Sequence, residues 1–233
     1  MSDSDRLECK RYRGLRSRRT EAVSKSSRPT LTERRAEELR LAIANTARDM
    51  FVADGDTSAT VERICETVGI APRTFHRHFP VKEDVMGPLF RRSQAIIIDF
   101  LKNAPADADV AETLARAFTT EVYKRRTPES DRTFMTLMIH TPQYRLRWLE
   151  WGEQLCGPIT EFLSARVELG DDPFLRRLPA ELIVHTSRQA YIQWVDQEVG
   201  GDFSEVEALQ LRGMKMLLVG LRAVMGQPSA PVP

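Results

Sequence analysis

Four polar residues on one short segment have the side chains that proteins use to read the edges of DNA bases. They are Arg73, Thr74, His76 and Arg77. Phe75 and Phe79 lie among them, four positions apart, so both would fall on one face of a helix. If the protein holds that face, an arginine can donate two hydrogen bonds to guanine, a threonine offers a hydroxyl and a methyl group, and arginine or histidine can bind phosphate. The first chemistry that these residues suggest is therefore DNA recognition in a major groove.

Residues of this kind reach a major groove when a helix-turn-helix presents them. A short helix is predicted after Thr60, a suitable N-cap, because apolar residues within 61–68 recur at i, i+3, i+4 and i+7. Gly69 supplies the turn, and Pro72 suits the first position of the next helix, which Pro80 ends. A plain three-helix packing unit without a role in DNA binding would show the same apolar spacing.

The order of the residues resembles the DNA-binding segment of the TetR family of transcriptional regulators. That segment typically runs T-[VI]-x-x-I-A-x-x-[AV]-G-V-S-x-x-[TA]-[LIF]-Y-x-[HY]-F-x-[SN]-K-[ED]-x-[LV]. This sequence matches it at Thr60, Val61, Ile64, Val68, Gly69, Thr74, Phe75, His78, Phe79, Lys82, Glu83 and Val85. The resemblance implies an all-α homodimer with three N-terminal helices on DNA and a larger helical domain that binds a ligand. We expect the DNA-binding residues to be Thr60, Arg73, Thr74, His76, Arg77, His78 and Lys82.

Four positions within the segment depart from the family pattern. Cys65 replaces an alanine and keeps the position apolar, and His76 replaces a tyrosine. Ala71 and Val81 replace serines that would cap helices, and a lost N-cap weakens a helix by about 1 kcal/mol. These changes bear on the affinity for DNA rather than on the fold.

The rest of the sequence also predicts helices, because apolar residues recur at helical spacing between breaks at Pro and Gly, without the alternation of strands. Thr32 is the expected N-cap of the first helix. The fold class is therefore all-α, with helices expected at residues 32–54, 61–68, 72–79, 82–103, 109–126, 129–140, 143–169, 179–199 and 204–225.

We expect four parts along the chain. They are a disordered basic arm at 1–30, a helix-turn-helix DNA-binding domain at 31–81, a helical ligand-binding and dimerisation domain at 82–226, and a disordered tail at 227–233. The arm holds nine Arg and Lys against four acidic residues. It is either a solvated tail or an arm that touches DNA phosphates or a minor groove, and the sequence leaves both open.

The formal net charge of +1 conceals an asymmetry. Residues 1–80 carry 16 Lys and Arg against 12 Asp and Glu, whereas residues 81–233 carry 18 against 21. This distribution fits a DNA-binding end and a slightly acidic body. No apolar run is long enough to cross a bilayer and no secretory signal is evident, so we expect a cytoplasmic protein without membrane contact.

Large apolar side chains are concentrated in the second half of the chain. Each could simply pack in the core, but as a set they could line an apolar cavity between helices. The candidate ligand pocket comprises Phe118, Phe134, Met135, Met138, Trp148, Trp151, Leu155, Tyr191 and Trp194. Polar groups that could orient a small apolar ligand are His140, Gln143, Tyr144, His185, Arg188 and Gln189.

The last two predicted helices favour a dimer interface, because closed twofold dimers predominate among oligomers. Gly213 and Gly220 lie seven residues apart on one face, and glycine inside a helix costs about 1 kcal/mol relative to alanine. A close approach of two helices would offset that cost, although packing within one chain is the alternative. The candidate interface comprises Leu182, Gly213, Leu217, Gly220, Leu221 and Val224.

Nothing in the sequence indicates an enzyme, a cofactor or a metal site. His76 and His78 are two positions apart, so on a helix they point in opposite directions and cannot share a metal. No HExxH, GxSxG, Walker A or GxGxxG pattern occurs, and Cys9, Cys65 and Cys156 are expected to be reduced thiols. The function expected is a ligand-responsive repressor that binds a near-palindromic operator. The alternative is a helical DNA-binding architectural or interaction module without ligand control.

Overall fold

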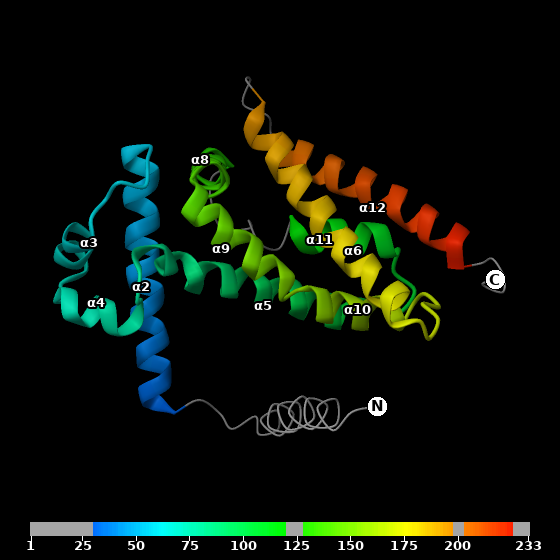
Figure 1. Ribbon diagram of the computed structural model, residues 1–233, viewed down its shortest axis with the longest axis horizontal. Coiled ribbons are helices and arrows are strands. Elements are labelled where there is room, and N and C mark those ends of the chain that lie inside the picture. The colour runs from blue at the N-terminus through cyan, green and yellow to red at the C-terminus, as the bar shows by residue number, and fades with distance from the viewer. Residues whose placement is uncertain (1–29, 120–127, 198–202, 226–233) are drawn as a thin grey trace, which may run out of the picture. The chain divides into compact units, whose positions relative to one another are not determined.

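A computed structural model describes residues 30–119, 128–197 and 203–225, and every regular element in these ranges is a helix (Figure 1). The helices are α2 (Leu31–Asp54), α3 (Val61–Val68), α4 (Pro72–His78), the 3-10 helix η1 (Lys82–Met86), α5 (Gly87–Asn103), α6 (Val110–Phe118), α8 (Pro128–His140), α9 (Pro142–Glu153), α10 (Cys156–Ser164), α11 (Pro173–Asp196) and α12 (Phe203–Met225). The expected all-α fold class is confirmed for these residues. The arm and the tail expected at 1–30 and 227–233 lie outside the described residues, apart from Thr30.

The chain divides into two units, residues 1–37 and residues 38–233. In the first unit, the described residues begin α2 with a reciprocal cap. Thr30 Oγ1 accepts a hydrogen bond from Glu33 N (3.2 Å), and a Glu33 carboxylate oxygen accepts one from Thr30 N (2.7 Å). This is a capping box, which satisfies two N–H groups at the helix start. The expectation that Thr32 caps this helix was therefore wrong, because Thr30 has the glutamate three residues after it.

The second unit contains the helix-turn-helix. Thr60 caps α3 by accepting a hydrogen bond from Arg63 N (3.2 Å), as expected. Gly69 then takes a left-handed backbone conformation (φ 79°), which glycine adopts without a steric penalty. Pro72 begins α4, but Ala71 makes no side-chain cap before it, and Val81 makes none before η1.

Four of the expected helices differ in the structure. The helix expected at 109–126 ends at Phe118, with Thr119 in a turn, and residues 120–127 lie outside the described residues. The helix expected at 82–103 begins as η1 and becomes α-helical at Gly87. The helix expected at 143–169 breaks after Glu153, because Pro158 has no N–H to donate to the carbonyl of Gln154. The helix expected from 179 begins at Pro173, where Asp172 Oδ1 accepts hydrogen bonds from Phe174 N (2.8 Å) and Leu175 N (3.3 Å).

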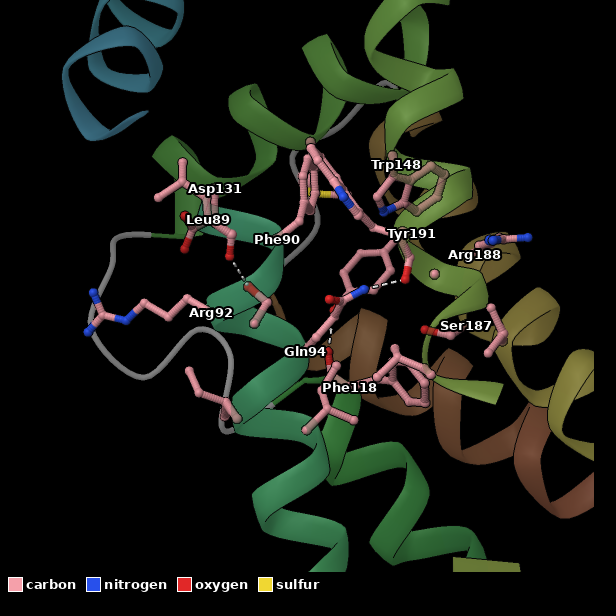
Figure 2. Close-up of a pocket in the computed structure, with 18 of the residues that line it drawn as sticks. Leu89, Phe90, Arg92, Gln94, Phe118, Asp131, Trp148, Ser187, Arg188 and Tyr191 are labelled. Atoms are coloured by element: carbon pink, nitrogen blue, oxygen red, sulfur yellow. Dashed lines mark hydrogen bonds between the residues drawn. The ribbon is translucent and has the colours of Figure 1, made fainter. Parts of the chain in front are cut away.

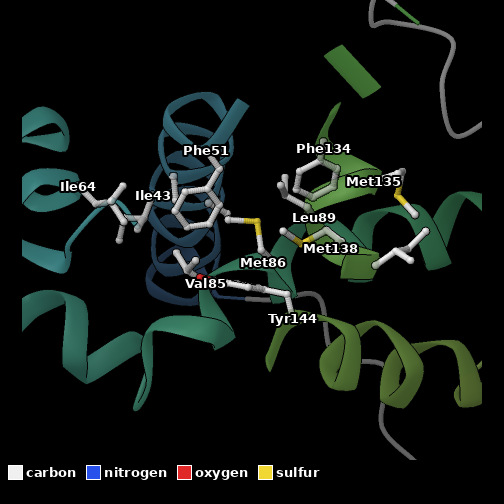
Figure 3. Close-up of a cluster of buried hydrophobic side chains, with 14 of the residues drawn as sticks. Ile43, Phe51, Ile64, Val85, Met86, Leu89, Phe134, Met135, Met138 and Tyr144 are labelled. Carbon is white, nitrogen blue, oxygen red and sulfur yellow. The ribbon is translucent and has the colours of Figure 1, made fainter. Parts of the chain in front are cut away.

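Two hydrophobic clusters lie within residues 38–233. The first, which we call the shared core, contains buried residues of α2, α3 and α4 together with residues of η1, α5, α8, α9, α11 and α12. Figure 3 shows part of this core, with Phe51 and Met86 near Phe134 and Tyr144. The second cluster joins α5, α6, α10, α11 and α12. Helices α2, α3 and α4 therefore share a core with α8 and α9 and do not form one of their own.

No helix in the described part of the chain combines the length and the apolarity needed to cross a membrane.

Candidate DNA-binding surface and ligand cavity

Helix α4 has a buried side and an exposed side. Phe75 and Phe79 are 0% and 2% exposed, with ring centroids 5.2 Å apart. Arg73, His76 and Arg77 are exposed, in agreement with the sidedness predicted from the sequence. Thr74 and His78 differ, because both are half-buried. Two aromatic rings thus fix the orientation of a helix whose outer side carries three basic or hydrogen-bonding side chains.

The sequence around this surface lacks negative charge. Between Glu66 and Glu83 the chain contains no Asp or Glu, but it contains Arg73, Arg77 and Lys82. A surface with this composition attracts phosphates, and phosphate attraction supplies most of the sequence-independent affinity for DNA.

Lys82 and Thr60 both make contacts within the protein. The Lys82 ammonium donates to Thr57 O (2.8 Å) and Ala59 O (3.3 Å) and lies 6.0 Å from the centroid of the Phe51 ring. Two of its three donor positions therefore hold the loop that leads into α3, which leaves one for a phosphate. The role of Lys82 in holding this loop was not predictable from the sequence, because its partners are backbone carbonyls that no side-chain pattern reveals.

His78 lies apart from the exposed residues of α4. Its Nε2 is buried and has no hydrogen-bond partner. Burial, and then the nearby charges of Arg40 and Arg77, lower the pKa of His78 below its usual value. The neutral imidazole is therefore favoured at neutral pH, and this residue adds less positive charge to the surface than the sequence suggested.

A cavity of about 620 Å³ lies among α5, α6, α8, α9 and α11 (Figure 2). Seven of the nine predicted pocket residues line it: Phe118, Phe134, Met135, Trp148, Trp151, Leu155 and Tyr191. Met138 and Trp194 do not, because both are 0% exposed in the shared core. Trp194 packs edge-to-face on Phe203, with ring centroids 5.7 Å apart.

Helix α5 provides a wall of the cavity that the sequence analysis missed. Phe90 lies 4.6 Å from Trp151 and 6.2 Å from Phe134 between ring centroids. A Cβ atom at Gly87 would lie 2.9 Å from Trp151 Cζ2, so this glycine allows the indole to lie against α5. The sequence contained one indication that α5 borders a cavity. Gln94 is a polar residue on the buried side of this helix, and a buried amide needs hydrogen-bond partners.

Most polar groups of the cavity are engaged by the protein. The Gln94 side chain donates to Trp151 O, and the Tyr191 hydroxyl donates to Phe118 O. Ser187 Oγ accepts from Gln210 Nε2 (2.9 Å). Arg188 donates through Nη2 to Leu149 O, but its Nε is buried and donates to no acceptor. Arg188 therefore lines the cavity with Nη2 held by the backbone and with Nε covered by protein atoms. Of the six polar residues that the sequence suggested could orient a ligand, Arg188 lines the cavity.

A buried ion pair connects the cavity with α2. Arg48 Nη2 lies 2.9 Å from Asp131 Oδ1 and donates to Ser130 Oγ (2.8 Å), and the guanidinium lies 5.3 Å from the centroid of the Phe134 ring. Asp131 and Phe134 both line the cavity. The sequence contained one indication of this pair, because Arg48 falls within the apolar stripe of α2. An arginine on the buried side of a helix requires an oppositely charged or hydrogen-bonding partner.

The candidate dimer residues fall into two groups. Leu182 (41% exposed) and Gly220 are exposed, whereas Leu217 and Leu221 are half-buried and Val224 lies outside the described side chains. A Cβ atom at Gly213 would lie 2.4 Å from Thr186 Cγ2, so this glycine makes a close contact with α11 of the same chain, which is the alternative given for it. Met216 (70%) and Val219 (69%) are exposed apolar residues of α12 that the sequence analysis did not select.

Among the described residues, Cys65 and Cys156 are free and buried, and no group of three or more His, Cys, Asp or Glu is arranged to hold a metal ion. Cys9 lies outside these residues.

Comparisons with known proteins give consistent results. Residues 43–87 match the family model for bacterial regulatory proteins of the tetR family. The HTH-type transcriptional regulator TcmR of Streptomyces glaucescens is 30% identical over 154 residues, which are 62% of this chain and 68% of that protein.

Two solved structures share the fold. Thermus thermophilus FadR, a TetR-family transcriptional repressor in complex with lauroyl-CoA, has a TM-score of 0.57 and 20% identity, covering 83% of this chain and 98% of that one. Salmonella enterica GusR has a TM-score of 0.53 and 17% identity, covering 88% of this chain and 100% of that one.

Proposed function

The chain belongs to the TetR family of bacterial regulatory proteins and is a DNA-binding transcriptional regulator, and on this basis we propose that it is a ligand-responsive repressor. A homodimer binds a near-palindromic operator, and a small molecule in the cavity releases it. Two DNA-binding helices related by a twofold axis would contact half-sites about one helical turn apart.

Helix α4 is the proposed reading element. Arg73 and Thr74, near its N-terminus, would contact bases, because the first residues of a recognition helix approach the base edges. His76 and Arg77 would contact phosphates, as would the remaining donor of Lys82. The buried phenylalanines on the other side support this assignment, since they fix which side chains can face a groove.

The cavity is the proposed ligand site. Its volume lies within the range typical of small-molecule sites, and its walls are mostly aromatic and apolar. We propose an apolar molecule that carries at least one hydrogen-bond acceptor or anionic group, placed near the cationic side chain of Arg188, which lines the cavity. The lauroyl-CoA bound by FadR has an apolar acyl chain and an anionic coenzyme A part, which supports the choice of a ligand with both an apolar part and a polar or anionic group for this fold.

One observation carries the proposal. The cavity lies against Phe134 and Asp131 of α8, and α8 packs in the shared core with the helices that carry the DNA-binding surface. A ligand can regulate DNA binding only if it binds two states of the protein with different affinities, and a cavity bordered by the shared core allows that difference.

The test begins with an operator selected by the purified protein from a pool of random-sequence duplexes. Small apolar acids and aromatic compounds are then screened for an increase in melting temperature, and each hit is added to the protein–operator complex. We expect hits to weaken operator binding at least tenfold, measured by fluorescence anisotropy. Phe90→Ala should abolish the response, whereas Leu146→Ala, an exposed site on α9, should retain it. Hits that leave the DNA affinity unchanged would favour a DNA-binding module without ligand control.

A further inference from the structure

Arg48 and Asp131 form an ion pair that is almost completely removed from water. Their side chains are 7% and 3% exposed, and Arg48 Nη2 lies 2.9 Å from Asp131 Oδ1. Arg48 belongs to α2, which packs with the helix-turn-helix, and Asp131 belongs to α8. The pair therefore joins a helix of the DNA-binding side to a helix of the ligand-binding side.

The same residues border the cavity. Asp131 lines it on the side of Leu89 and Phe90, as Figure 2 shows. Phe134 also lines it, and the ring of Phe134 lies 5.3 Å from the Arg48 guanidinium. A molecule that packs on this side of the cavity thus lies against Asp131, the partner of Arg48, and against the ring next to its guanidinium.

Burial makes the pair resistant to partial displacement. Arg48 Nη1 also lies 3.1 Å from Oδ1 of the exposed Asp49, so the cost of separating the pair falls mainly on Asp131, whose side chain is 3% exposed and would lose its arginine. Removing the partner of a buried charge costs far more than shifting apolar side chains. The apolar contacts of the shared core are non-directional, so they allow small shifts between α2 and α8. The ion pair and the hydrogen bond to Ser130 are directional and fix the position of α2 relative to α8.

From this geometry, and resting on the proposed function, we propose that the Arg48–Asp131 pair transmits the state of the cavity to the DNA-binding helices. While the pair is intact, α2 follows α8. Filling the cavity moves α8, and the pair carries that movement through α2 to α3 and α4. Arg48 and Asp131 are positioning residues in this scheme, since neither contacts DNA.

A cavity-filling substitution tests this coupling without knowledge of the ligand. Val184 of α11 lines the cavity and is 3% exposed, so Val184→Phe places added volume inside it. Operator affinity is measured for the parent, Val184→Phe, Asp131→Asn and the double variant, with a duplex selected by the parent protein. We expect Val184→Phe to weaken binding at least tenfold in the parent but less than threefold in the Asp131→Asn background.

A second ion pair provides the matched control. Arg147 Nε of α9 lies 3.0 Å from Asp84 Oδ1 of η1, and both side chains are about one-third exposed. In an Arg147→Gln background we expect the full tenfold effect of Val184→Phe, because this pair does not border the cavity. If Asp131→Asn does not fold, as judged by its circular dichroism melt, Arg48→Met with Asp131→Leu replaces it, since an apolar pair of similar size removes the charges without leaving one unpaired.

The results separate the two proposals. An equal effect of Val184→Phe with and without the charged pair would overturn the coupling role and leave ligand control intact. A Val184→Phe protein that folds like the parent and binds operator with the parent affinity would overturn ligand control through this cavity, and the coupling role with it.

Discussion

Arg73 lies on the exposed side of α4, and Phe75 and Phe79 are buried on the opposite side of this helix. We expect Arg73→Ala to weaken operator binding by about 1–3 kcal/mol, the range for one good base contact, with little change in melting temperature. Arg176→Ala is the matched control, because Arg176 is also exposed but belongs to α11. Binding of the parent strength by Arg73→Ala, measured on the selected operator by fluorescence anisotropy, would exclude this residue from base reading.

Lys82 is expected to act on stability as well as on DNA. Its ammonium donates to Thr57 O and Ala59 O, so Lys82→Ala should lower the free energy of unfolding by about 1 kcal/mol. It should also weaken binding to all DNA sequences alike and reduce the salt dependence by about one unit, since a phosphate contact is lost. Lys102→Ala, an exposed lysine of α5, should change neither quantity. Urea unfolding and salt titrations of DNA affinity measure both effects.

The lowered pKa of His78 predicts acid sensitivity. The folded protein binds a proton at this site less readily than the unfolded chain, whose histidine pKa is about 6.5. The unfolded state therefore takes up more protons as the pH falls below about 6.5, and stability decreases. His78→Gln should flatten this part of the curve when urea unfolding is measured between pH 7 and pH 5. An unchanged slope would show that His78 titrates alike in both states.

At the scale of elements, the aromatic wall of the cavity depends on a glycine in α5. A Cβ atom at Gly87 would lie 2.9 Å from Trp151 Cζ2, so Gly87→Ala should displace the indole and cost about 1–3 kcal/mol of stability. Gly157→Ala in α10 is the control, because a Cβ atom there meets nothing within 4 Å. That variant should be stabilised by up to about 1 kcal/mol. Equal melting temperatures for the two variants would contradict the tight packing at Gly87.

The helix boundaries that were predicted correctly from the sequence are those set by residues next to the boundary. Thr60, Gly69 and Pro72 mark the limits of α3 and α4 through caps and turns that involve only neighbouring residues. The break before α10 was missed, because the effect of Pro158 falls on a carbonyl four residues earlier. The apolar composition of the cavity was predictable, but its α5 wall and the Arg48–Asp131 pair were not, because helical periodicity does not specify which helices become neighbours.

At the scale of the whole molecule, the dimer is the part of the proposal that depends on a surface rather than on a core. Met216, Val219 and Gly220 form an exposed apolar strip on α12, and Leu182 is an exposed leucine on α11. Solvent contact with large apolar side chains is unfavourable, and a second copy would cover them. Gly213 lies against Thr186 in the same chain and is not part of this exposed strip.

We therefore expect Val219→Glu to separate the dimer, since it would bury two carboxylates at the twofold contact without partners. A monomer can hold only one half-site, so its operator affinity should fall far more than the roughly tenfold to hundredfold loss of a single base contact. Leu146→Glu replaces another exposed apolar residue, on α9, and should remain dimeric. Sedimentation velocity at micromolar concentration gives the mass of each variant. A parent protein that sediments as a monomer and still binds the full operator would exclude the dimer, and with it the twofold reading of DNA.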